Sequence, residues 1–353
     1  MEKLLKTDNK YPLVSIIVPC RNEETFIGQC LDSIIDNDYP KDMLEILIVD
    51  GISEDGTRKI VKEYNRKFPF IILLDNCKRI TSSALNRGIK AAKGDVIIVM
   101  GSHSTYEKNY LSQCVSYLTN GDADNVGGIC KILPQNNSLI ARSIAYASSS
   151  SFGAGDAYYR IGSEKTRYVD TVFGGCYRKK IFDIVGYFDE DLLRTQDSEF
   201  NARLIKNGGK ILLVPTIVSY YYARKSLWEL LKMNLQYGYS KPLAVKKIGK
   251  VYTSRQLLPP IFVASSVISL ILSLFSSVFF WLFLFISISY IIVNLGYSLK
   301  ISLKKGFKYF LFLPVVFTTV HFGWGIGYLR GVWDFIIFEH HKKRKVKDMP
   351  LTR

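Results

Sequence analysis

The feature that most restricts this chain is a long apolar run in its C-terminal third. No charged residue occurs between Arg255 and Lys300, and a helix that crosses a bilayer needs roughly 20 apolar residues. The run is therefore long enough for two spans joined by a tight turn. We expect that turn near Leu274 to Val278, within the Ser-rich FSSV, and we expect the first span to open after Pro259-Pro260.

Basic residues flank the run on both sides. They are Lys246, Lys247, Lys250 and Arg255 before it, and Lys300, Lys304, Lys305 and Lys308 after it. Because Lys and Arg mark the cytoplasmic ends of spans, both flanks are expected in the cytoplasm, which an out-and-back hairpin satisfies. The preceding segment, SLWELLKMNLQYGYSKPLAVKK, mixes Leu, Trp and Met with Lys, the pattern of a helix lying in the membrane interface.

A third apolar stretch, from Tyr309 to Leu329, gives conflicting signals. Its length would allow a crossing, but a crossing would leave the basic HHKKRKVK tail on the outer face. Pro314, His321 and three glycines within the stretch favour a broken or re-entrant helix with the tail in the cytoplasm. His321 is either a functional group or a histidine hydrogen-bonded within a helix bundle, and we favour the second reading.

Composition excludes several other classes of protein. Of the net charge of +16, the part from Leu230 onward carries +14, so the basic residues bracket apolar runs instead of forming the face of a nucleic-acid-binding fold. The six cysteines form no CxxC pair, which argues against a zinc site and for reduced thiols. MEKLLKTDNKYP has no secretory signal pattern, so the N-terminal domain is expected in the cytoplasm.

The N-terminal two thirds of the chain predict an α/β fold. The apolar runs LVSIIVP, LEILIVD, FIILLD and DVIIVM alternate with helical patterns that start near Glu23, Thr57, Thr81 and Glu107, as βαβ units around a parallel sheet do. Ligands bind at the carboxyl ends of such strands. Here those ends carry PCRNE, DGISEDGT, DNCKR and GSHS.

Four ordered motifs in this part resemble those of family 2 glycosyltransferases. They are VSIIVPCRNEE, VDGISEDGT, GGCYRKKIFDIVGYFDE and TQDSEFNARLIKNGGKI. The likeness covers roughly Leu13 to Ser240, and RQLLPP before the apolar run extends it towards the succinoglycan glucosyltransferase branch. It implies a Rossmann-like GT-A domain followed by C-terminal transmembrane helices. It also implies a nucleotide-sugar donor and inverting transfer to a hydroxyl of a lipid-linked or polysaccharide acceptor.

The resemblance also implies an organisation and a location. We expect a cytoplasmic GT-A domain over 1–225, interfacial helices over 226–256, the hairpin and third segment over 257–338, and a basic tail over 339–353. The enzyme would be a multi-pass protein of the cell membrane. Its partners would be a nucleotide sugar, with a UDP-sugar as the first expectation, an acceptor and the membrane, but no nucleic acid. QxxRW is absent near Gln236 to Tyr239, which favours single-sugar addition.

Site residues follow from the same resemblance, position by position. Asp197 stands where the family places its catalytic base, although an acid at a helix N-terminus has that position for stability alone in many proteins. The expected nucleotide-sugar-binding residues are Pro19, Arg21, Glu23, Asp50, Arg79 and Ser102. Gly175, Arg178 and Tyr239 would belong to the acceptor or phosphate region.

The family's metal-binding carboxylate is missing. The chain reads Gly101-Ser102-His103 where Asp-x-Asp or Asp-Ala-His is usual, and one histidine is a poor site for Mg²⁺. Three readings follow: Mn²⁺ held by His103 with the substrate's phosphates, metal-free stabilisation by cations such as Arg79, or a donor site that does not work. The last would make the chain a silent nucleotide-sugar binder or an assembly partner, and a transporter or channel is a weaker rival.

Overall fold

The structure, a computed structural model, describes residues 11–251 and 253–339. Its contacts divide the chain into two units. Within the described residues, the first unit comprises 11–131 and 162–221, and the second comprises 132–161, 222–251 and 253–339. The insertion at 132–161 therefore groups with the C-terminal helices, because α5 (Leu139–Ser148) contacts α13 (Leu313–Val332) and α10 (Leu227–Ile248). The boundaries expected from the sequence placed this insertion within 1–225.

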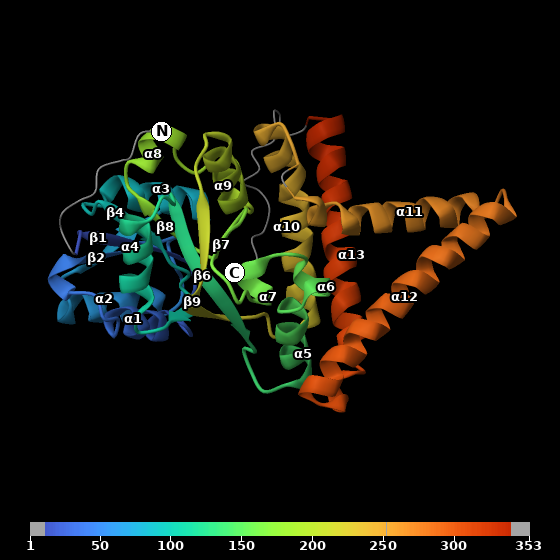
Figure 1. The fold of residues 1–353 in the computed structure, drawn as a ribbon, viewed down its shortest axis with the longest axis horizontal. Coiled ribbons are helices and arrows are strands. Elements are labelled where there is room, and N and C mark those ends of the chain that lie inside the picture. The colour runs from blue at the N-terminus through green and yellow to red at the C-terminus, as the bar shows by residue number, and fades with distance from the viewer. Residues whose placement is uncertain (1–10, 252, 340–353) are drawn as a thin grey trace. The chain divides into compact units, whose positions relative to one another are not determined.

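The first unit is built on one sheet, in which nine strands are found among the described residues (Figure 1). Along the sheet the order is β3-β2-β1-β4-β8-β6-β9-β5, and β7 pairs with β9. The strands are β1 (Val14–Cys20), β2 (Leu44–Asp50), β3 (Ile71–Asp75), β4 (Val96–Val99), β5 (Ser104–Tyr106), β6 (Asn125–Leu133), β7 (Arg167–Tyr168), β8 (Gly175–Arg178) and β9 (Ile211–Tyr222).

The first four strands confirm the parallel βαβ expectation. β1 pairs in parallel with both β2 and β4, and β2 pairs in parallel with β3. β8 then joins β4 in the antiparallel direction. β1 and β2 are continuous runs rich in Val, Ile and Leu, and both of their faces are buried, as is usual for parallel strands covered by helices. Their carboxyl ends, and the loops that follow, lie at one edge.

Helices cover the two faces of these strands. Those of the first unit are α1 (Ile27–Ile35), α2 (Thr57–Lys67), α3 (Thr81–Ala91), α4 (Tyr110–Asn120), α8 (Ile181–Val185) and α9 (Gln196–Lys206), with a 3-10 turn at Lys41–Met43. Ile16 belongs to the core shared with α1, α2 and α4. Its neighbour Ile17 points the other way, and a Cβ on Gly88 of α3 would lie 2.5 Å from it. Gly88 thus lets α3 approach the opposite face closely.

The second unit is helical. Besides α5, α10 and α13 it contains α6 (Ser151–Ala154), α7 (Tyr158–Ile161), α11 (Leu258–Leu272) and α12 (Ser277–Lys305), with 3-10 turns at Ser254–Gln256 and Phe307–Tyr309 and a π-helical turn at Trp333–Ile337. A buried cluster joins α5, α10 and α13 through Ile144, Leu230 and Phe317. The helical segment SLWELLKMNLQYGYSKPLAVKK is confirmed as α10, whose N-cap is Ser226.

Two helices of the described residues are long and apolar enough to cross a membrane, Ser254–Leu272 and Ser277–Lys305. They meet at a turn over residues 273–276, as expected for the hairpin (Figure 1). Most of the large apolar side chains of α12 are exposed, including Trp281, Phe285 and Ile292. An apolar surface of this extent in a soluble protein would favour aggregation, so it is suited to lipid.

The third apolar stretch is unbroken, contrary to expectation. α13 runs continuously over Leu313–Val332, because Pro314 occupies its first turn, where a missing N–H costs nothing. Its glycines do not interrupt the helix but allow close packing. A Cβ on Gly327 would meet the backbone oxygen of Leu235, and one on Gly331 would meet that of Tyr239. His321 is held in this bundle: its Nε2 lies 2.8 Å from Phe152 O and its Nδ1 lies 3.0 Å from Tyr290 Oη.

Candidate active site

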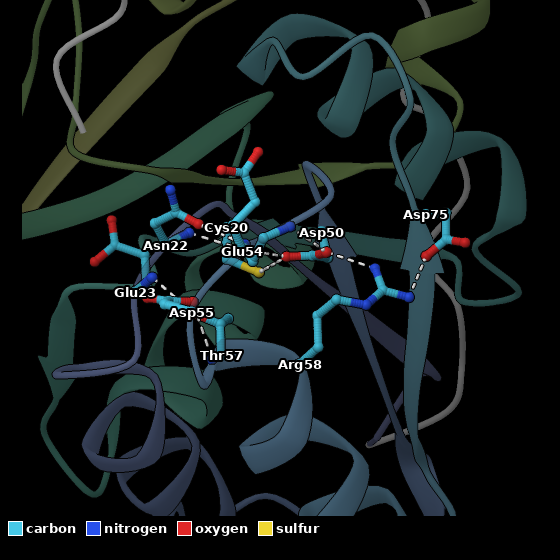
Figure 2. Close-up of polar contacts among 10 residues, drawn as sticks. Cys20, Asn22, Glu23, Asp50, Glu54, Asp55, Thr57, Arg58 and Asp75 are labelled. Carbon is cyan, nitrogen blue, oxygen red and sulfur yellow. Dashed lines mark hydrogen bonds and ion pairs between the residues drawn. The ribbon is translucent and has the colours of Figure 1, made fainter.

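Two loops meet at the carboxyl ends of β1 and β2. The register pairs Pro19 with Val49 and Cys20 with Asp50, so residues 21–24 and 51–57 leave the sheet side by side. Hydrogen bonds run between them in both directions (Figure 2). Glu23 N donates to Thr57 Oγ1 at 2.8 Å, and Glu54 N donates to Asn22 Oδ1 at 2.9 Å. The loops are therefore fixed to each other before any ligand binds.

Asp50 is fully buried at the end of β2 and its carboxylate is surrounded by donors. Ser53 N donates to Oδ2 at 3.0 Å, the Ser53 hydroxyl donates to Oδ1, and Arg58 Nη1 donates to Oδ2 at 2.6 Å. Arg58 also reaches Asp75 at the end of β3, at 2.8 Å (Figure 2). Asp50 thus holds the loop after β2 in place through these hydrogen bonds.

The two arginines expected at the donor differ in their surroundings. The stem of Arg21 packs on Gly51, where a Cβ would come within 3.2 Å of it. Its Nε is inaccessible and has no hydrogen-bond partner in the described part of the chain. Arg79 adopts a left-handed backbone, with φ of 58°, and its guanidinium lies 3.7 Å from Glu54 in an exposed pair. Exposed pairs of this kind contribute little, so Arg79 is available to an anion.

The Gly101-Ser102-His103 segment follows β4 at the same edge of the sheet. His103 Nδ1 lies 3.1 Å from Oε1 of Glu23, which is 4% exposed, and its ring packs against Tyr221 with centroids 5.0 Å apart. Ser102 is buried. A Cβ on Gly101 would lie 3.2 Å from Ser104 Oγ and 3.5 Å from Phe173, so aromatic and hydroxyl groups surround the position where the family's carboxylate would stand.

Gly174 and Gly175 bring the next motif to this edge. Both have positive φ, of 70° and 126°, and Gly175 pairs with Val99 near the end of β4. Arg178, at the other end of β8, pairs with Val96 instead. Its guanidinium donates to the carbonyls of Leu118 and Ala123 near the end of α4, at 2.9 Å for Ala123. The structure therefore does not bring Arg178 to the strand ends, and it gives that residue a structural role.

Asp197 is exposed on the first turn of α9. Its Oδ1 accepts from Ser198 N at 2.8 Å. Thr195, the N-cap, has φ of 65°, a conformation that threonine rarely adopts. Burial, followed by the nearby Asp197 charge, raises the pKa of Tyr177 above its usual range. Tyr177 lies close to Gly175, so Asp197 belongs to the same end of the sheet.

A buried polar network beneath Asp197 was not anticipated from the sequence. Asn125 Nδ2 donates to Tyr177 Oη and to Asn201 Oδ1, both at 3.1 Å, and Asn201 Nδ2 donates to Thr171 Oγ1 at 3.0 Å. These residues come from β6, β8, α9 and the loop before β8. Since no short-range pattern links them, only the fold reveals that they fix α9 to the sheet.

Comparisons with known proteins agree with this geometry. The sequence profile described as "Glycosyl transferase family 2" matches residues 15–184. A protein of Methanococcus voltae, named dolichyl N-acetyl-alpha-D-glucosaminyl phosphate 3-beta-D-2,3-diacetamido-2,3-dideoxy-beta-D-glucuronosyltransferase, is 36% identical over 242 residues, which are 66% of this chain and 74% of that protein.

This chain belongs to glycosyltransferase family 2.

Other relatives cover more of its length. Succinoglycan biosynthesis protein ExoA of Rhizobium meliloti is 27% identical over 322 residues, which are 91% of this chain and 95% of ExoA. A mannosyltransferase from Pyrobaculum calidifontis, solved with GDP-Man and Mn²⁺, has a TM-score of 0.58 at 18% identity, covering 92% of this chain and 88% of that one. The likeness in fold confirms the GT-A expectation, and the chain is a glycosyltransferase.

The described part of the chain has no cluster of protein ligands for a divalent cation. Divalent cations in proteins take several oxygen or nitrogen ligands. In residues 11–251 and 253–339, no group of three or more His, Cys, Asp or Glu side chains could hold one. At the family position the side chains are His103 and Glu23, and these hydrogen-bond to each other. The residues present do not form a metal site.

Two features remain to be described. Tyr239 belongs to the second unit, where its hydroxyl donates to Asp334 Oδ2 at 2.8 Å and its ring packs on Phe335. In the first unit, a pocket of about 580 Å³ opens beside the end of β3, and it is lined by Asn76, Cys77, Lys78, Arg87 and Glu190 among others. Lys78 pairs with Glu190 there at 2.5 Å. The sequence pointed to Lys78-Arg79 but not to this pocket.

Proposed function

We propose that this glycosyltransferase transfers a single sugar, with inversion, from a nucleotide sugar to a hydroxyl of a lipid-linked or polysaccharide acceptor. The exposed carboxylate of Asp197, at the end of the sheet where the strand-end loops gather, carries the proposal. The acceptor hydroxyl must be able to reach the catalytic base. Asp50 and Glu23 do not meet that requirement, because both are buried at this edge.

The step needs one carboxylate. Asp197 accepts the proton of the acceptor hydroxyl as its oxygen forms a bond to C1 of the sugar. The bond between C1 and the phosphate oxygen breaks on the opposite face, and the electron pair leaves with the nucleoside diphosphate. Since that group departs as an anion, no second carboxylate is needed to protonate it. Donors and cations aimed at the diphosphate lower the barrier, and Arg21 and Arg79 are suitably placed on the strand-end loops.

The nucleotide would bind over the interlocked loops after β1 and β2. The stem of Arg21 packs on Gly51, and Asp50 and Arg58 hold the loop in place. Pro19, Glu23 and Ser102 would line the same pocket. We expect a UDP-sugar, with other bases tested beside it. His103 would face the diphosphate with Glu23 fixing its ring, and transfer would not require a metal.

The acceptor is assigned by chemistry and by relatives. The name of the Methanococcus voltae relative refers to a dolichyl N-acetyl-alpha-D-glucosaminyl phosphate, and ExoA is named for succinoglycan biosynthesis. This chain has two helices able to span a bilayer, with basic residues at both ends of the pair. We place the catalytic unit at the cytoplasmic membrane face, where those basic residues attract anionic lipid-linked acceptors.

The deciding experiment measures transfer of radiolabel from a panel of UDP- and GDP-sugars to membrane lipids of the host. Native protein is compared with Asp197→Asn, each with and without EDTA. Asp191→Asn, also an exposed acid before α9, serves as the matched control. We expect a loss of about 10²- to 10⁴-fold for Asp197→Asn, the usual contribution of a positioned base, and little change for Asp191→Asn.

Four outcomes are informative. Transfer that persists in EDTA supports donor activation without a metal, whereas loss in EDTA that Mn²⁺ restores contradicts it. Full activity of Asp197→Asn removes Asp197 from the role of base. Nucleotide binding without transfer from any donor would instead favour a silent nucleotide-sugar binder.

A further inference from the structure

Arg224 is a buried cation that has no partner among the residues the structure describes. It lies two residues after the end of β9, and its side chain is 6% exposed. Among the described residues, no hydrogen bond, ion pair or aromatic ring engages its guanidinium. Its Nε is inaccessible and unpaired. An arginine side chain stays protonated inside proteins, so the positive charge cannot be lost on burial.

The backbone around Arg224 is firmly held. Ala223 N donates to Leu133 O at 2.9 Å, and Ala223 belongs to the buried cluster of the second unit with Ile144 and Phe317. On the other side, Ser226 caps α10 by accepting from Glu229 N at 3.2 Å. Because hydrogen bonds hold the backbone on both sides of Arg224, the folded chain keeps this residue buried.

No carboxylate in the described part of the second unit pairs with Arg224. Within its described residues the unit has four acidic side chains, and another group engages each one. Asp156 pairs with Arg255 at 2.6 Å, Glu229 accepts from Lys225 N at 3.3 Å, Asp334 accepts from Tyr239 Oη at 2.8 Å, and Glu339 pairs with Lys246 at 2.8 Å. The described residues therefore supply no anion to the Arg224 guanidinium.

An anion is the partner that such a site favours. An unpaired buried charge destabilises a protein, and a planar guanidinium matches the oxygens of a phosphate group in a two-point contact. The site lies close to the N-terminus of α10, whose partial positive charge adds to the attraction. We propose that Arg224 binds a phosphate group of a substrate. The chemical class of that substrate rests on the proposed function.

Two substrates of the proposed reaction could supply the phosphate. One is the diphosphate of the nucleotide sugar, and the other is the phosphate of a lipid-linked acceptor. Equilibrium binding separates them: tritiated UDP is measured by dialysis, and a polyprenyl phosphate is measured in neutral detergent micelles by tryptophan fluorescence. Full-length native protein is compared with Arg224→Gln, Arg224→Lys and Lys225→Gln. Lys225 is the adjacent, exposed cation and changes the net charge equally.

We expect Arg224→Gln to weaken one of the two ligands by about 10- to 100-fold, the usual effect of losing hydrogen bonds to a charged group. Arg224→Lys should recover part of that loss, and Lys225→Gln should bind as the native protein does. The weakened ligand identifies the source of the phosphate. If Arg224→Gln binds both ligands with native affinity, the proposal is wrong.

Thermal unfolding gives a second, independent readout. Arg224→Met removes the buried charge and keeps the apolar stem, so it should raise Tm in the absence of ligand. Saturating phosphate-bearing ligand should raise the Tm of the native protein and leave that of Arg224→Met unchanged. A fall in Tm for Arg224→Met without ligand would show that the arginine is structural. None of these measurements requires sugar transfer, so an inactive enzyme would contradict the proposed function and not this inference.

Discussion

At the residue scale, Asp50 shows how a strand-end carboxylate supports a site from beneath. The Asp50 side chain is fully buried, and Arg58 Nη1 lies 2.6 Å from its Oδ2. The Arg58 side chain is 28% exposed. Hydrogen bonds to Asp50 and then to Asp75 raise the pKa of Arg58 above its usual value. Removing one partner of such a pair leaves an uncompensated charge in the interior.

We therefore predict that Arg58→Ala lowers the free energy of unfolding by about 3 kcal/mol. Arg66→Ala, an exposed arginine on the same helix, should change it by less than about 0.5 kcal/mol. Chemical denaturation of both variants beside the native protein measures the difference. Arg58→Ala and Asp50→Asn should be less than additive when combined, since each removes the same pair. Equal effects of Arg58→Ala and Arg66→Ala would show that the pair does not stabilise the fold.

The contribution of Asp55, in the same loop, to the stability of the protein should depend on pH. Burial acts to raise its pKa, but hydrogen bonds from the Thr57 hydroxyl and from the amides of Thr57 and Glu24 outweigh burial and hold the pKa below 3.8. A depressed pKa contributes stability that is complete above the unfolded value and is lost as the pH falls through the folded one.

Native protein should thus have a higher Tm than Asp55→Ala at pH 6, and the gap should close as the pH falls below about 3.8. Glu54→Ala, which removes the adjacent exposed acid, serves as control. Thermal unfolding of the three proteins from pH 6 to pH 2 makes the comparison. A gap that stays constant over this range would exclude the hydrogen-bonded carboxylate as its cause.

At the element scale, local sequence patterns predicted the strands and the motifs at their ends. They did not predict contacts between elements that are distant in the sequence. LEILIVD became β2 without a change of bounds, and the motifs after β1, β2 and β4 meet at one edge because parallel strands end together. Arg178 was misplaced because β8 runs antiparallel to β4, so its two ends face opposite edges of the sheet. The Asn125 network joins three elements that are distant in sequence, which no periodicity reveals.

The glycines of α13 were expected to break a helix, and instead they allow it to pack against α10. Gly327→Ala would place a methyl group against the backbone oxygen of Leu235, which cannot move away without shifting α10. We predict a loss of about 1–3 kcal/mol, the usual cost of overpacking. Gly296→Ala in α12 is the matched control, because nothing lies within 4 Å of the added Cβ. It should be neutral or stabilising by up to about 1 kcal/mol.

Thermal unfolding in detergent compares the two variants. If Gly327→Ala is as stable as Gly296→Ala, the close contact between α10 and α13 is not part of the folded protein.

At the scale of the whole molecule, composition indicated a soluble part and a membrane part, and the structure divides the chain into two units, of which the second contains the two helices long and apolar enough to cross a membrane. What the sequence did not reveal is that 132–161 belongs with the helices, since its polar, serine-rich segment carries no apolar run of membrane length. The exposed apolar side chains of α12 had no equivalent in the predicted strands, which are buried on both faces. Burial, more than hydropathy, distinguishes the two kinds of apolar segment.

If α11 and α12 cross the membrane out and back, the side of the membrane on which each unit is exposed can be predicted. Of the six cysteines, which all lie in the described residues, Cys77 of the first unit is exposed and the others are buried, so native protein carries one reactive thiol. A second reporter is Leu274→Cys in a Cys77→Ser background, since Leu274 is exposed in the turn between α11 and α12. With both basic flanks in the cytoplasm, the turn lies outside and Cys77 inside.

A membrane-impermeant maleimide should therefore label Leu274→Cys in intact cells and should label the native protein only after permeabilisation. Labelling of Cys77 in intact cells would place the catalytic unit outside, where nucleotide sugars are absent, and would contradict the proposed reaction at the cytoplasmic face. If both reporters react only after permeabilisation, α11 and α12 do not cross. Their exposed apolar surface would then be inserted from the cytoplasmic side alone, and alkaline extraction would release the protein from the membrane.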